Sequence, residues 1–337
     1  MKDFGRLKRL TKRAAINVHN SLYPTHADRI NVILWRGSKG MLNSGSIVEK
    51  TLCDAGFKVR QVGARLAGPQ TALPLLKSKV NIFMQYVYPE FLPYAKHNVL
   101  IPNPEWGEHE ASFIRNNFDC VLAKTRDCER IYRQELDQVE YISFTSNDIR
   151  DEAEKQKKYI HFGGKSPLKG TDAVIALWNS QPDLPPLHLF SYEKDFKEVI
   201  KSPNIIYRYE KLADHDIRRL QNEAFFHICP SEYEGFGHQL NEAKSAGSVV
   251  FTTDAAPMNE LVRPDFGYLI RARFKGTMQR AMLYDVEESA FLESILESAE
   301  MSHSEIDERC ERARDSYEKN DVFFKRRLVD IISSLFH

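Results

Sequence analysis

The segment after the apolar run Phe225–Cys229 has residue types and spacing that can bind a charged, hydroxyl-rich ligand. The run enters a turn with Gly235 and Gly237, and a helical pattern follows. Such glycines let the backbone approach a ligand, and the amides of a first helical turn form an anion site. Glu234 and Glu242 are eight residues apart, about 10–12 Å along a helix axis. They are too distant to share a proton or a metal ion, but they can bind hydroxyls on two parts of a ligand. By spacing alone, a helix start that carries Glu because of the helix dipole is an equal alternative.

Alternating strand-like and helix-like segments from Arg29 onward predict parallel βαβ units covered by helices. Strands are expected first at Ile30–Trp35, Phe57–Val62, Asn81–Val87, Asn98–Pro102, Phe118–Ala123 and Val139–Phe144, and then at Tyr159–Phe162, Leu187–Ser191, Asn204–Tyr207, Phe225–Cys229 and Val249–Thr252. The tail from Glu287 is expected to be helical, with a final amphipathic segment at Val322–Phe336.

The charge-dense stretch Asp151–Lys158 marks the expected domain boundary. A length of 337 residues corresponds to about two domains, so we expect one domain of residues 1–150 and another of residues 151–320. Open α/β domains bind ligands at the carboxyl ends of their strands, which makes a cleft between the two domains the expected site.

The net charge of zero conceals an asymmetry between the two halves. Residues 1–150 carry 22 Lys and Arg against 15 Asp and Glu, whereas residues 151–337 carry 25 against 32. The basic and the acidic half are expected to have different partners. The five cysteines are scattered without zinc-type spacing, which is typical of buried thiols in a reducing compartment.

Residues 230–261 read PSEYEGFGHQLNEAKSAGSVVFTTDAAPMNEL and resemble the donor-binding signature of family-4 glycosyltransferases. That signature has Pro-Ser, Glu-Gly-Phe-Gly, a second Glu eight positions after the first, and then Ala, a small residue and Gly before a β-branched strand. The resemblance implies an α/β fold of the GT-B type, in which two Rossmann-like domains face each other across a cleft. It also implies that residues 321–337 cross back onto the N-terminal domain as a helix.

The resemblance assigns roles to individual residues. Glu234 contacts the sugar at its reacting end, and Glu242 holds the nucleotide ribose. Residues 161–170, HFGGKSPLKG, are similar to the segment whose two cations clamp the donor diphosphate. Lys165 there replaces the usual Arg in a loop one residue shorter, and Lys169 matches the family's Lys, although a solvated lysine at a helix start remains the alternative for Lys169. The expected donor-binding set also includes Gly164, Gly235, Phe236 and Gly237.

The N-terminal half matches the family weakly. Asn103, Glu105 and His109 follow a predicted strand, at a position where the family often has His, and we include Asn103 and Glu105 among the candidate catalytic residues. A proline-rich turn with solvated charges is an equal alternative. A glycine loop at Gly37–Gly45 is a second candidate for the cleft.

Asp214-His215-Asp216 has the Asp-x-Asp pattern of metal-binding glycosyltransferases of another fold. A metal-binding pair should end an apolar strand, whereas this one begins a helix, so we interpret Asp214 as a helix N-cap. No metal or other cofactor is expected, since the nucleotide-sugar acts as a co-substrate.

The N-terminal residues 1–14 are basic and lack the apolar run of a secretory signal, so we expect a cytoplasmic protein. Leu7, Leu10 and Ala14 on one helical face give two hypotheses, a solvated helix or contact with anionic lipid on the inner face of a membrane.

The resemblance predicts a glycosyltransferase of the hexosyltransferase type that moves a sugar from a nucleotide-sugar to an acceptor with retention and without a metal ion. UDP-sugar is the first choice of donor. The basic half favours an anionic acceptor, such as a lipid-linked glycan, a polysaccharide or, less favoured, nucleic acid. The alternatives are a GT-B sugar-nucleotide epimerase and a non-catalytic module that binds a nucleotide-sugar or a polyanion.

Overall fold

The chain forms two compact units in the computed structural model, which describes residues 28–37, 39–64, 77–107, 109–164, 166–192 and 195–336. Unit 2 runs from Phe144 to Val322, and unit 1 takes the residues before and after it. Unit 2 begins at Phe144, before the expected boundary at residue 150. The reason is that the Phe144 ring packs on Phe236 of unit 2, with 5.0 Å between the ring centroids.

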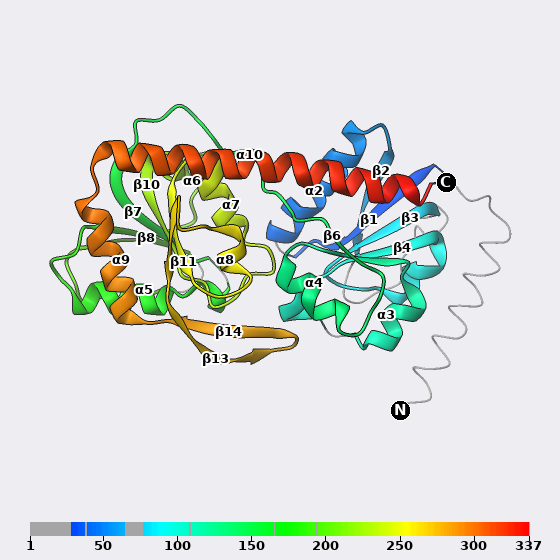
Figure 1. The fold of residues 1–337 in the computed structure, drawn as a ribbon, viewed down its shortest axis with the longest axis horizontal. Helices are drawn as coiled ribbons and strands as arrows, with labels where there is room; N and C mark the ends of the chain where they lie inside the picture. The colour runs from blue at the N-terminus through cyan, green and yellow to red at the C-terminus, as the bar shows by residue number, and fades with distance from the viewer. Residues whose placement is uncertain are drawn as a thin grey trace. The chain divides into compact units, whose positions relative to one another are not determined.

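Unit 1 is built around a parallel sheet of six strands in the order β2-β1-β3-β4-β5-β6 (Figure 1). Its strands are β1 (Arg29–Trp35), β2 (Lys58–Ala64), β3 (Ser78–Met84), β4 (Ala95–Ile101), β5 (Cys120–Ala123) and β6 (Val139–Tyr141). Its helices are α2 (Lys39–Asp54), α3 (Ala111–Asn117) and α4 (Arg126–Arg133), with short 3₁₀ turns at Pro89–Tyr94 and Pro104–Trp106. The strands are apolar because both faces of a parallel sheet are covered.

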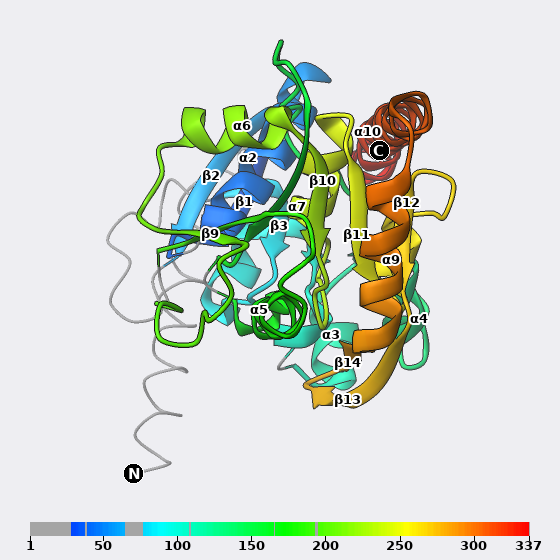
Figure 2. The same cartoon turned by 90° about the vertical axis from the view of Figure 1, so that its left-hand side faces the viewer.

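Unit 2 repeats this design with a second parallel sheet in the order β12-β11-β10-β7-β8-β9. Its strands are β7 (Gln156–Phe162), β8 (Leu187–Ser191), β9 (Ile205–Tyr209), β10 (Ala224–Cys229), β11 (Val249–Thr253) and β12 (Gly267–Ile270). Its helices are α5 (Thr171–Ser180), α6 (Asp214–Glu223), α7 (His238–Ser245), α8 (Met258–Leu261) and α9 (Glu288–Glu300), the last lying along β12 in Figure 2. These two sheets with their helices confirm the predicted α/β class.

The tail from Glu287 is helical, as expected from the sequence. It forms α9 and then the long helix α10 (His303–Ser334), which includes most of the expected amphipathic segment Val322–Phe336 (Figure 1). Two elements of unit 2 were not predicted from the sequence, the strand β12 and a separate antiparallel hairpin of β13 (Ala272–Met278) and β14 (Ala281–Val286). The helices in the described ranges lack the combination of length and apolar composition that crossing a membrane requires.

The expected glycine loop Gly37–Gly45 is wrong, because α2 already begins at Lys39. Gly45 lies inside that helix, where a Cβ atom would stand 2.4 Å from Cδ2 of Leu34 on β1. This glycine allows the helix to pack closely on the strand, so its role is structural.

The expected N-cap role of Asp214 is also wrong. The N-cap of α6 is Ala213, and Asp214 is the first residue of the helix. Asp214 and Asp216 both lie in the first turn, where negative charge is favourable against the helix dipole.

Candidate functional site

Two loops of unit 2 meet at the carboxyl edge of its sheet. One follows β7 and the other follows β10, and these strands are parallel neighbours. The loops are joined by a backbone hydrogen bond of 2.8 Å from Glu232 N to Leu168 O. Gly170 has a left-handed backbone with φ of 67°, and a Cβ atom there would stand 2.0 Å from Pro230 O. Only glycine permits this close approach of the two loops.

Lys169 and Glu234 form an ion pair across these loops. Lys169 Nζ donates to Glu234 Oε1 at 2.7 Å, and the Ser231 hydroxyl donates to the same oxygen at 2.6 Å. The side chains are only 20% and 11% exposed. Burial opposes the charge of Lys169, but the Glu234 carboxylate outweighs it and holds the pKa of Lys169 above its usual value. Lys169 is therefore charged at neutral pH.

Glu242 belongs to the same neighbourhood. It lies on α7 and accepts a hydrogen bond of 3.1 Å from Nε2 of Gln221, a buried residue at the end of α6. Its negative charge contributes, after that of Glu234, to the raised pKa of Lys169. The structure thus brings Lys169, Glu234 and Glu242 together, and it adds Gln221 as a positioning group that no motif in the sequence indicated.

His161 contacts the strand and the helix that hold the two loops in place. It is fully buried at the end of β7, where Nδ1 lies 2.7 Å from Ile228 O and Nε2 lies 2.8 Å from the Thr171 hydroxyl. Burial lowers the pKa of His161 to about 4, so the ring is neutral at pH 7. A neutral ring with Nδ1 donating and Nε2 accepting satisfies both contacts. His161 therefore connects β7, β10 and the start of α5.

The glycines and Phe236 take different places around these loops. Gly164 and Gly237 have left-handed backbones with φ of 59° and 80°, and Gly237 immediately precedes α7. The Phe236 side chain, in contrast, is 3% exposed and packs on the rings of Phe144 and His238. Phe236 can reach a ligand only through its backbone. Lys165 lies outside the described residues.

Unit 1 holds a polar cluster at the carboxyl edge of its own sheet. Asn103 follows β4 and Lys124 follows β5, its parallel neighbour. Lys124 Nζ donates to Asn103 Oδ1, while Asn103 Nδ2 donates to Glu105 Oε1 at 3.0 Å. Lys124 and Glu105 are each 5% exposed. The cation and the anion therefore fix the two ends of the Asn103 amide.

His109 takes a different position from these residues. Its ring stacks on Phe113 of α3, with 4.9 Å between centroids. Asn103 and Glu105 were candidates from the sequence, but Lys124 was not. A contact between residues 21 positions apart follows from strand pairing and leaves no local pattern in the sequence.

Most of unit 2 matches the model of a known protein family. Residues 145–283 match the family described as glycosyl transferases group 1. This group 1 segment contains the ion pair, Glu242 and both loops. No curated protein sequence matches the chain.

Solved structures share the fold of most of the chain. A glycosyltransferase from Rickettsia africae has a TM-score of 0.71 at 12% identity, over 92% of this chain and 99% of that one. Sucrose-phosphate synthase from Thermosynechococcus elongatus has a TM-score of 0.67 at 13% identity, and the match covers 92% of this chain and 98% of that one. HepE from Anabaena, solved with UDP and glucose, has a TM-score of 0.66 at 14% identity, and the match covers 92% of this chain and 100% of that one. At these identities the likeness establishes the fold alone, and it confirms the GT-B assignment.

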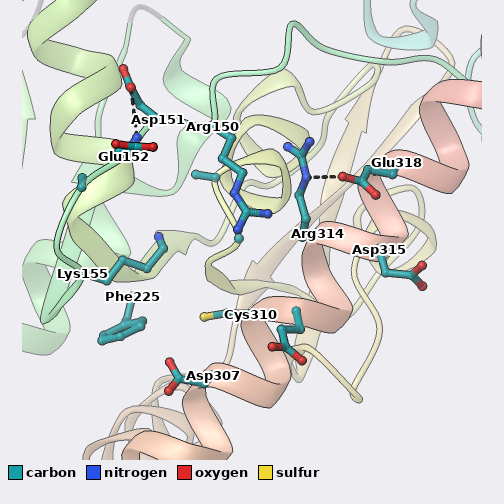
Figure 3. A pocket seen from close by; sticks show the side chains of 14 residues that line it. Arg150, Asp151, Glu152, Lys155, Phe225, Asp307, Cys310, Arg314, Asp315 and Glu318 are labelled. Atoms are coloured by element: carbon teal, nitrogen blue, oxygen red, sulfur yellow. Dashed lines mark hydrogen bonds and ion pairs between the residues drawn. The ribbon is translucent and has the colours of Figure 1, made fainter.

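The group 1 segment also borders a cavity of about 900 Å³ at the opposite edge of its sheet (Figure 3). Phe225 at the start of β10 and Gly247 before β11 line it, which places it at the amino ends of the strands. Arg150, Lys155 and Arg314 also line it, but six Asp and Glu residues outnumber these cations. An acidic lining disfavours a nucleotide diphosphate, so the carboxyl edge remains the candidate donor site.

Proposed function

We propose that the chain is a glycosyltransferase that moves a sugar from a nucleotide-sugar to an acceptor. The observation that carries the proposal is the Lys169–Glu234 ion pair, held at the carboxyl edge of unit 2 between Gly170 and the helix that begins after Gly237. The match of residues 145–283 to group 1 glycosyl transferases supports it.

In this proposal the positive groups of unit 2 bind the diphosphate. As the bond between the anomeric carbon and the diphosphate oxygen breaks, negative charge grows on the leaving group. Lys169, Lys165 and the amides at the start of α7 stabilise that charge. Lys169 is charged and held in place by Glu234 before the donor arrives, so little reorganisation is needed.

The carboxylates bind hydroxyls of the donor. Glu234 takes the sugar near its reacting carbon, and Glu242, oriented by Gln221, takes the ribose. Uracil is the first choice of base, an assignment supported by the complex of the HepE structure with UDP and glucose. We further propose retention of configuration and chemistry without a metal ion.

Unit 1 supplies the acceptor side in this proposal. The amide of Asn103 has its oxygen toward Lys124 and its nitrogen toward Glu105, and each atom keeps capacity for one more hydrogen bond. A fixed amide of this kind can position a sugar hydroxyl. The excess of Lys and Arg in residues 1–150 favours an acceptor with negative charge.

A thermal-shift panel of UDP-, GDP- and ADP-sugars tests the donor. One of them should raise Tm, because a ligand that binds only the folded state stabilises it. Glu242→Gln should remove most of that shift, while Glu297→Gln on α9 serves as a control carboxylate outside the site. A panel in which no nucleotide-sugar shifts Tm would contradict the proposal.

Turnover separates transfer from the alternatives. A transferase consumes donor faster when acceptor glycans or lipid-linked acceptors are added, an epimerase converts donor without acceptor, and a binding module leaves it intact. NMR of the product anomer tests retention, and activity in excess EDTA tests the absence of a metal requirement.

A further inference from the structure

The β13–β14 hairpin stands apart from the sheet of unit 2. It follows β12 directly and therefore leaves from the carboxyl edge, and it projects from the body of the unit in Figures 1 and 2. A backbone bond of 3.1 Å from Tyr284 N to Glu232 O attaches it beside the candidate donor loop. An isolated two-stranded hairpin is marginal in water, so its exposed surface calls for a partner.

One face of the hairpin is apolar and exposed. Phe274 pairs with Tyr284 across the strands, their rings 6.0 Å apart, and the Tyr284 hydroxyl lies 3.8 Å from the Met282 sulfur. Phe274 is 60% exposed and Met282 is 41% exposed. Among the large apolar side chains that the structure describes, only Val322 is more exposed than Phe274.

The hairpin is basic within an acidic half. Residues 271–286 contain four cations and one acid, Asp285, and Lys275 pairs with Asp285 and with Glu232. Arg271 and Arg273 are 65% and 77% exposed and share the one carboxylate of Glu287, which is 19% exposed. The two guanidinium groups are therefore more exposed than the carboxylate that they share. Because one carboxylate neutralises only one of them, one positive charge remains in excess.

These properties favour a lipid surface over other partners. A second copy that added a strand would meet the β-bulge between Phe274 and Gly276 and the charged side chain of Lys275, devices that block pairing at a sheet edge. A soluble polyanion would use the arginines but leave Phe274 and Met282 in water. Apolar side chains flanked by cations match an anionic bilayer, where both find partners.

We propose that the β13–β14 hairpin docks unit 2 on an anionic lipid surface. Phe274 and Met282 enter the interfacial region of the bilayer, and Arg271 and Arg273 contact the headgroups. Because Tyr284 bonds the backbone two residues before Glu234, docking holds the candidate donor site close to the surface. Docking does not depend on donor binding or on turnover.

Co-sedimentation of the full chain with vesicles tests the proposal. Wild-type protein should bind vesicles of phosphatidylcholine with phosphatidylglycerol and bind pure phosphatidylcholine much less. Phe274→Ser with Met282→Ser should weaken binding about tenfold or more, from the apolar area lost. Arg271→Gln with Arg273→Gln should weaken it only on the anionic vesicles. The control, Leu296→Ser with Val322→Ser, removes two apolar side chains of similar exposure elsewhere in unit 2 and should bind as wild type.

The remaining outcomes would overturn the proposal. A variant with Lys8, Arg9 and Lys12 changed to Gln tests the basic N-terminus, which lies outside the described residues. If that variant loses all binding while the hairpin variants bind as wild type, the hairpin is not the docking element. A hairpin variant whose mass by size exclusion is halved, with vesicle binding unchanged, would assign the surface to a second copy instead. An unchanged Tm of the hairpin variants shows that they fold, and the nucleotide-sugar panel, run in parallel, reports separately on the proposed function.

Discussion

The carboxyl edges of the two sheets carry charged side chains in different ways. In unit 2 the charges lie on loops that approach through glycines, and Lys169 and Glu234 bond each other directly. In unit 1 the charges of Lys124 and Glu105 are nearly completely buried and are linked through the amide of Asn103. One edge therefore carries a charged pair, and the other carries an oriented neutral amide. In the proposed function the first edge binds phosphate and the second binds a hydroxyl.

The largest effect is expected from breaking the ion pair of unit 2. Lys169→Met leaves the Glu234 carboxylate buried without its cation, which should cost about 3 kcal/mol in the free energy of unfolding. It should also lower kcat about 100-fold, since the leaving diphosphate loses a positive partner. Urea unfolding and initial-rate kinetics measure the two effects.

A double variant separates these two roles. Lys169→Met with Glu234→Gln removes both charges and should regain much of the stability, but not the rate. The exposed pair Lys50–Asp54 provides the control, and Lys50→Met should leave the urea midpoint unchanged. Full activity of Lys169→Met would remove Lys169 from the site.

The close approach of the two loops gives the next prediction. Gly170→Ala forces a Cβ atom against Pro230 O and should cost about 3 kcal/mol from strain and clash together. Gly56 also has positive φ, 91°, but has open space around it, so Gly56→Ala should cost only about 1 kcal/mol. The difference between the two urea midpoints measures the loop contact. Equal costs would mean that the loops can separate without loss.

The contrast between the edges also explains what the sequence could predict. The loops of unit 2 were predicted because their glycines, Glu234 and Glu242 are local in sequence and form a motif. Lys124 was missed because it meets Asn103 only after β4 and β5 pair. The β13–β14 hairpin was missed because no clear turn signal separates its strands, although their alternation of charged and apolar residues is typical of an exposed strand. Gly45 was assigned to a loop, because its close packing on Leu34 appears only once α2 lies on β1.

Unit 1 is expected to respond to the loss of Lys124 without any change in donor binding. Lys124→Met removes a buried charged donor from Asn103 and should cost about 2 kcal/mol locally, or about 30-fold in amide protection of peptides from β4 and β5. Hydrogen exchange followed by mass spectrometry measures this loss. Lys96→Met, an exposed change on β4, is the matched control. A weakened donor thermal shift in Lys124→Met would show that the two edges do not act separately.

Acid should weaken unit 2 through His161, which gives the smallest effect. Burial lowers the pKa of His161 to about 4, against 6.5 for an ordinary histidine. Between these values the unfolded chain binds a proton that the folded ring does not, so stability falls as pH falls through this window. From pH 7.5 to 5.5 the loss is about 1.3 kcal/mol for this residue.

Trp178 is fully buried in unit 2, so its fluorescence in a Trp35→Phe, Trp106→Phe background reports on that unit alone. His161→Asn should reduce the pH dependence by this amount, although His227, whose pKa burial lowers to about 3, retains its own contribution. An unchanged pH slope in His161→Asn would mean that the ring is protonated in the folded state and that the link between Ile228 and Thr171 is built differently.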